Sequence, residues 1–202
     1  MLGYNFLKHI KEFQRYIRNY QYEVGDGNIY FPKASATVSG LYTHWVTGYE
    51  SELREDHNLL GDEGLNHMLG VVLKSGSQVT TWYCMLQETN GTPTSTISAG
   101  TYQSAVGEIT SGAEGYSQAT RVLWVGDAVD TTNTEVVNLA SPAAFTIVTA
   151  TSLPVYGAAL ISTSTKGAEV APLLSAGKFT AVRNLANGDT FNLKYKVDLD
   201  VV

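Results

Sequence analysis

The chain has 202 residues, of which 44% are hydrophobic and only 16% are charged. Charged residues make up about 25% of an ordinary soluble domain, whereas disordered chains combine high charge with few apolar residues. The net charge of −6 argues against a general nucleic-acid-binding protein, which would be basic. This length and composition suit one folded domain, or one domain with an appendage.

The first 20 residues form a basic amphipathic segment. Four apolar residues are spaced four, three and four apart: Phe6, Ile10, Phe13 and Ile17. This spacing is typical of one face of a helix, and basic residues such as Lys11 and Arg15 fall on other faces. The segment could pack on its own domain, dock as an arm on a partner protein, or lie on a membrane surface.

Residues 21–55 are rich in aromatic side chains. The GDGN sequence at 25–28 predicts a tight turn within a short hairpin, and residues 34–49 fit either a strand or an extended arm. These aromatic residues could form a sugar-stacking surface, although core and interface positions are commoner for aromatics. We predict that the six arm residues named above contact a partner, together with Tyr22, Tyr30 and Trp45.

Residues 56–75 are predicted to contain a helix. Four apolar residues recur at i, i+3, i+4 and i+7: Leu65, Met68, Leu69 and Val72. Asp62 and Glu63 suit the start of the helix, because carboxylates complement its dipole, and Gly76 suits its end. The acidic and histidine side chains of this region lack the spacing of a standard metal site, so we predict a structural role for them.

From residue 78 onward the sequence predicts β-structure, because short runs of β-branched and aromatic residues alternate with turn residues. The predicted strands are 79–86, 121–125, 135–139, 144–149, 155–163, 178–184 and 190–201. In the last of them apolar and polar residues alternate strictly, which indicates one buried and one exposed face. We expect an antiparallel β-sandwich or jelly roll at 56–202, preceded by the arm and aromatic-rich extension at 1–55. Residues 87–118 are expected to form a long functional or interface loop.

The sequence contains none of the common catalytic or nucleotide-binding motifs. It contains no nucleophile elbow, P-loop or dinucleotide-binding motif, and its single cysteine, Cys84, lies in an apolar run typical of a buried side chain. We therefore expect no catalytic residues, cofactor or metal, and we expect that the protein is not an enzyme.

Between residues 75 and 165 the only basic residue is Arg121. So little charge favours extended subunit contact or an inert coat.

Several separated motifs, in a fixed order, give the chain a family likeness. They are DHNLLGDEGLN (56–66), VTTWY (79–83), YSQATR (116–121), VYGA (155–158) followed by STSTK (162–166), and NGD (187–189). With these motifs the region from about 56 to 200 resembles a set of small structural proteins of tailed bacteriophages. Residues 1–55 are not covered by the likeness.

The resemblance implies a virion protein that is assembled in the cytoplasm of the bacterial host. We expect a head decoration, or cement, protein that forms a homo-oligomer, with a trimer as one expected order. It would bridge subunits of the major capsid protein, and neither nucleic acid nor a membrane is an expected partner. The alternative is a tail or fibre component, either an adaptor or a receptor-binding module. An enzyme such as a cell-wall hydrolase is the least supported reading.

Overall fold

The structure, a computed structural model, describes residues 23–25, 28–30, 36–130 and 132–201. The chain divides into two compact units, Met1–Thr37 with Val201–Val202, and Val38–Asp200. In the first unit β1 (Glu23–Gly25) pairs antiparallel with β2 (Asn28–Tyr30), so the predicted hairpin is confirmed.

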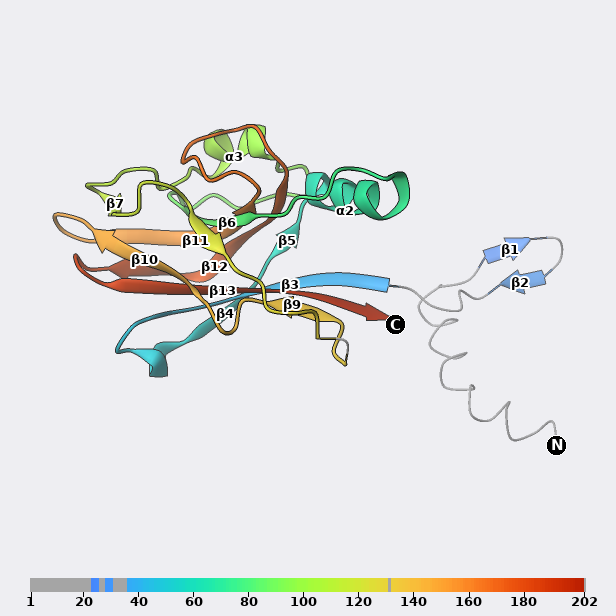
Figure 1. The fold of residues 1–202 in the computed structure, drawn as a ribbon, viewed down its shortest axis with the longest axis horizontal. Coiled ribbons are helices and arrows are strands. Elements are labelled where there is room, and N and C mark those ends of the chain that lie inside the picture. The colour runs from blue at the N-terminus through green and yellow to red at the C-terminus, as the bar shows by residue number, and fades with distance from the viewer. Residues whose placement is uncertain (1–22, 26–27, 31–35, 131, 202) are drawn as a thin grey trace. The chain divides into compact units, whose positions relative to one another are not determined.

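The unit Val38–Asp200 is a sandwich of two antiparallel sheets (Figure 1). The first has the order β4-β3-β13-β10-β7, and β9 also pairs with β13. Its strands are β3 (Ala36–Val46), β4 (Arg54–His57), β7 (Gly115–Tyr116), β9 (Glu135–Val137), β10 (Ala143–Val148) and β13 (Thr190–Val201). The second has the order β5-β12-β11-β6-β8. Its strands are β5 (Leu59–Leu60), β6 (Trp82–Gln87), β8 (Val122–Trp124), β11 (Leu153–Ile161) and β12 (Leu173–Leu185). The expected fold class, a mainly β antiparallel sandwich with a short helix, is confirmed.

Aromatic side chains fill the space between the sheets. Tyr42 of β3 and Tyr195 of β13 lie with ring centroids 4.6 Å apart, and both are fully buried. The Tyr42 hydroxyl and the Ser175 hydroxyl of β12 lie 2.8 Å apart, which joins the two sheets by a hydrogen bond. Since a buried hydroxyl without a partner would cost free energy, this pairing is what allows tyrosine rather than phenylalanine here.

Strand β13 keeps the alternation seen in the sequence. Phe191, Leu193 and Tyr195 are buried and Lys194 and Lys196 are half-buried, although the polar Asn192 is buried as well. The pattern fades toward the end of the strand, where Leu199 is 42% exposed. The predicted bounds of this strand agree with the structure because its inner face is covered throughout its first half.

Helix α2 (Asp62–Lys74) confirms the helix predicted within 56–75. It rests on β12, and Gly64 is its only buried residue. A Cβ atom at Gly64 would overlap the backbone of Leu174, so the absence of a side chain sets how closely helix and strand approach.

The region 87–118 is more ordered than a long loop. Helix α3 (Ala99–Ala105) begins with a capping box formed by Ser98 and Thr101. It packs in a second apolar cluster on the outer face of the second sheet, which includes Ile97, Tyr102 and Val106. The expectation of a long loop was therefore wrong at 99–105. The composition, rich in Thr and Ser, is typical of a loop, but the segment forms a capped helix with its own apolar contacts.

The sandwich begins earlier in the chain than the predicted boundary between residues 55 and 56. Strands β3 and β4 pair with each other, and β3 also neighbours β13, which makes them part of the first sheet. The segment 34–49, for which strand and extended arm were both open, forms a strand over most of its length. In the described ranges, no helix combines the length and apolar character needed to cross a membrane.

Replacing Gly64 by alanine should lower the free energy of unfolding by roughly 1–3 kcal/mol, because the new methyl group overlaps the Leu174 backbone. Gly70 is the matched control, since it lies in the same helix and a Cβ there meets no atom within 4 Å. Gly70→Ala should raise the free energy of unfolding by up to about 1 kcal/mol. Urea denaturation of both variants checks this, and equal effects would contradict the packing argument.

Candidate functional site

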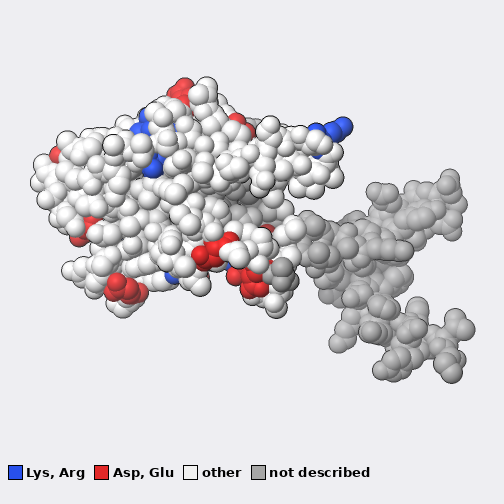
Figure 2. Space-filling model, viewed as in Figure 1, with Lys and Arg blue, Asp and Glu red and all other residues white. Residues whose placement is uncertain are grey.

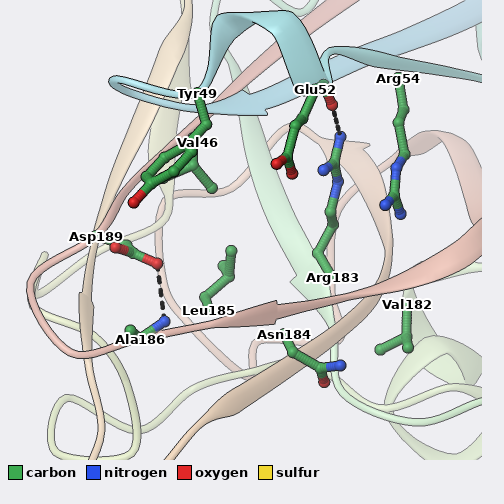
Figure 3. Close-up of a pocket in the computed structure, with 10 residues that line it drawn as sticks. All are labelled: Val46, Tyr49, Glu52, Arg54, Val182, Arg183, Asn184, Leu185, Ala186 and Asp189. Carbon is green, nitrogen blue, oxygen red and sulfur yellow. Dashed lines mark hydrogen bonds between the residues drawn. The ribbon is translucent and has the colours of Figure 1, made fainter.

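A polar pocket lies at one edge of the sandwich (Figure 3). We call it the arginine pocket, and it has a volume of about 410 Å³. One wall is the connection from β3 to β4, which contains the 3₁₀ helix η1 (Glu50–Glu52), and the other is the end of β12 with the turn that follows. Its polar lining residues are Tyr49, Glu52, Arg54, Arg183, Asn184 and Asp189.

Two tight turns shape the pocket. Gly48 has a φ of +87° at the end of β3, where the Tyr49 N–H donates to the Val46 carbonyl over 2.9 Å. Gly188 has the same φ of +87° between β12 and β13, and the Asp189 carboxylate accepts a bond from the Ala186 N–H over 2.8 Å. Glycine adopts this left-handed backbone at little cost, so the turn predicted at 187–189 is confirmed.

A hydrogen-bonded chain of three side chains runs from the pocket into the core. Arg183 Nε donates to His44 Nδ1 over 3.0 Å, which makes Nδ1 the acceptor. The proton of the imidazole therefore sits on Nε2, which donates to Asp56 over 2.8 Å. The Asp56 carboxylate also accepts bonds from the Thr180 N–H, over 2.7 Å, and the Thr180 hydroxyl, over 2.6 Å. We call these three side chains the Arg183–His44–Asp56 chain.

Burial decides the charge on His44. Desolvation, together with the charge of the neighbouring Arg183, lowers the pKa of His44 to about 4, against the opposing effect of the bond to Asp56. Burial raises the pKa of Asp56, but bonds from Thr180 and His44 outweigh this effect and the pKa lies below its ordinary value. At neutral pH the chain therefore consists of a guanidinium, a neutral imidazole and a carboxylate.

This chain is suited to joining elements rather than to proton transfer. His44 is fully buried, both of its ring nitrogens are engaged, and its ring stacks on Phe179 at 3.8 Å. A general base must reach the proton that it abstracts, and this imidazole is enclosed. Within the part of the chain that the structure describes, no three His, Cys, Asp or Glu side chains gather closely enough to hold a metal ion.

Arg121 and Glu108 form a buried ionic pair. Arg121 Nε and Nη2 donate to the two carboxylate oxygens over 2.8 and 2.6 Å, and Glu108 also accepts from the Gly167 N–H over 2.9 Å. Further bonds lead from Arg121 to the carbonyls of Thr163 and Ala168. The only basic residue between positions 75 and 165 thus fastens loops to the second sheet.

In contrast to the polar arginine pocket, the surface where β6 and β8 face β9 and β13 is mainly apolar. A groove of about 690 Å³ opens there, and we call it the apolar groove. Its apolar lining includes Val79, Trp82, Trp124, Val125, Val136 and Val197. Helix α2 lies beside it, since the His67 ring contacts the Trp82 ring edge-on at 5.8 Å.

Helix α2 exposes most of its apolar side chains. Leu65, Leu69, Val72 and Leu73 are 36%, 56%, 76% and 70% exposed, and we call them the α2 stripe. The helical spacing was thus predicted correctly, but the stripe that it marks mostly faces solvent. Only Met68, of the four residues that set the pattern, packs against the core.

Of the predicted partner-contact residues, Trp45 is the one whose side chain the structure describes. Trp45 lies half-buried in β3, with Lys194 Nζ 5.0 Å from its ring centre, and it lines neither the pocket nor the groove. The side chain of Tyr30 in β2 lies outside what is described. The remaining predictions fall on residues outside the described ranges: Phe6, Ile10, Lys11, Phe13, Arg15, Ile17 and Tyr22.

Sequence reasoning missed the two arginines of the pocket. One signal was present, because Arg183 falls at the period-two spacing of the buried Phe179 and Leu185. An arginine in register with the inward face of a strand indicates a buried, hydrogen-bonded cation. Nothing in the sequence marked Arg54, which becomes notable only beside Arg183.

Stability should fall as the pH falls from about 6.5 to 4, because the unfolded chain protonates His44 in this range and the folded chain does not. Between about pH 7 and pH 5 the expected loss is about 2 kcal/mol. His44→Gln should remove this part of the pH dependence, whereas the exposed His57→Gln should keep it. Urea denaturation across this range is the measurement, and identical slopes for both variants would contradict the assignment.

Comparisons with models of protein families and with curated protein sequences gave no match. The likeness to tailed-phage structural proteins therefore remains an expectation from the sequence motifs. The function of this chain has to be inferred from its own residues and their arrangement.

Proposed function

We propose that this protein is a structural virion protein of a tailed bacteriophage, acting as a capsid decoration protein that self-associates and bridges capsid subunits. The observation that carries the assembly role is the α2 stripe beside the apolar groove. Contiguous apolar surface of this kind marks contact sites in soluble proteins. The motif resemblance carries the assignment to a virion.

A second copy of this chain is the partner that suits the α2 stripe. Leu65, Leu69 and Val72 are spaced four and three apart, as in the contact rows of packed helix pairs. Asp62 and Lys74 lie at opposite ends of the helix. An antiparallel pair of α2 helices would therefore bring the acidic start of each helix to the basic end of the other. This contact favours a two-fold arrangement over the trimer expected from the resemblance.

The sparse charge supports broad contact with other virion proteins. Figure 2 shows few charged side chains over the face that it draws. Little charge has to be desolvated when such a surface is covered. In this proposal the basic segment at 1–20 contacts the major capsid protein, and binding to the assembled shell alone stabilises it by mass action.

Charge placed on the stripe should abolish self-association. Leu69→Lys and Val72→Lys introduce ammonium groups that cannot be buried in an apolar contact, yet the free energy of unfolding should change by less than about 0.5 kcal/mol because both sites are exposed. Val170→Lys, at a valine outside the stripe and the groove that is 82% exposed, is the control. Sedimentation velocity measures the outcome, and a wild-type chain that stays monomeric at high concentration would overturn the assembly contact.

The decoration role is tested on particles. We expect many copies over the whole head, and a chain lacking residues 1–20 should stay folded but no longer bind expanded shells. Gel densitometry of purified particles and co-sedimentation with shells measure the two quantities. A few copies at one vertex would instead favour the tail or fibre alternative, and adsorption blocked by the purified protein would identify a receptor-binding module.

A further inference from the structure

The arginine pocket contains two guanidinium groups, those of Arg54 and Arg183. Among the described residues, no acidic oxygen lies within 4.0 Å of Arg54 or Arg183. Figure 3 shows the two side chains next to each other. Burial and the charge of Arg54 lower the pKa of Arg183, and the carboxylates of Glu52 and Asp56 oppose this effect only in part. Two like charges held this near to each other are relieved by an anion between them.

Arg183 is held in place rather than free to move. Its side chain is 6% exposed, and Nη2 donates to the carbonyls of His44, over 3.1 Å, and Glu52, over 2.6 Å, while Nε bonds to His44 Nδ1. Nη1 has no hydrogen-bond partner among the described residues. A fixed guanidinium with an unused N–H group is suited to a carboxylate, which it can bind with little loss of entropy.

The other residues that line the pocket limit which anions could bind there. The carboxylates of Glu52 and Asp189 lie in the same pocket, so they would repel a doubly charged phosphate more than a single carboxylate, and they can accept bonds from hydroxyl groups. Tyr49 is 59% exposed, which leaves ring surface for the apolar face of a sugar. A volume of about 410 Å³ is in the range of small-molecule sites.

We propose that the arginine pocket binds an acidic sugar residue, with its carboxylate between Arg54 and Arg183 and its hydroxyls toward Glu52 and Asp189. The pocket shares no lining residue with the α2 stripe or the apolar groove. Sugar binding is therefore independent of the proposed virion assembly, and either can fail alone.

Glucuronate is the probe, and saturation-transfer NMR with the full chain measures its binding. We expect glucuronate to bind at least about tenfold more tightly than glucose, which lacks the carboxylate, and than acetate, which lacks the hydroxyls. Equal binding of glucose or acetate, tighter binding of inorganic phosphate, or no binding of glucuronate would each overturn the proposal.

Arg54→Gln tests the site itself, because Arg54 is exposed and can be changed without disturbing the buried Arg183–His44–Asp56 chain. It should weaken glucuronate binding about tenfold or more, with binding partly retained in Arg54→Lys. Lys74→Gln removes another exposed cation, which lies outside the pocket, and should leave binding unchanged. Unchanged binding in Arg54→Gln, or an equal loss in Lys74→Gln, would count against this pocket.

Discussion

Arg183 brings a positive charge to the edge of the sandwich, where its guanidinium donates to the neutral ring of His44. The neutral ring of His44 accepts a bond from Arg183 and donates one to Asp56. The Asp56 carboxylate in turn accepts a bond from Thr180, which lies on the same strand as Arg183. A buried ion without compensation costs several kcal/mol, so β3, β4 and β12 must keep this register for the charge to be tolerated. The link ties an edge of one sheet to an edge of the other, and Nη1 of the Arg183 guanidinium keeps no hydrogen-bond partner among the described residues.

The sandwich therefore has two surfaces of different chemistry. Around Arg183 the edges of the sheets are held by polar contacts, and the space between them is lined by charges and turns. Around Trp82 and Trp124 the sheets separate and leave apolar side chains in contact with solvent, continuous with α2. The first surface suits a small polar ligand, and the second suits another protein, because apolar area removed from water is the main source of affinity between proteins.

The bounds of β13, which has one covered face, could be predicted from the sequence, whereas the start of β12, which is covered on both faces, could not. The alternation of β13 gave its bounds correctly. For β12 the sequence predicted a start at 178, whereas the strand begins at Leu173. The residues before 178 are buried on both sides, with Leu174 in the main core and Leu173 against α3. Burial on both faces removes the period-two pattern by which a strand is recognised.

By itself the sequence determined the fold class, the helix at 62–74, the turn at 187–189 and the burial of Cys84, because each depends on local spacing, turn chemistry or local composition. Only the tertiary structure decided which apolar faces are covered, and it left the α2 stripe exposed. It also brought together Arg54 and Arg183 and placed His44 in surroundings that keep it neutral. Those properties depend on desolvation and on charges from distant strands, and neither is encoded in the spacing of neighbouring residues.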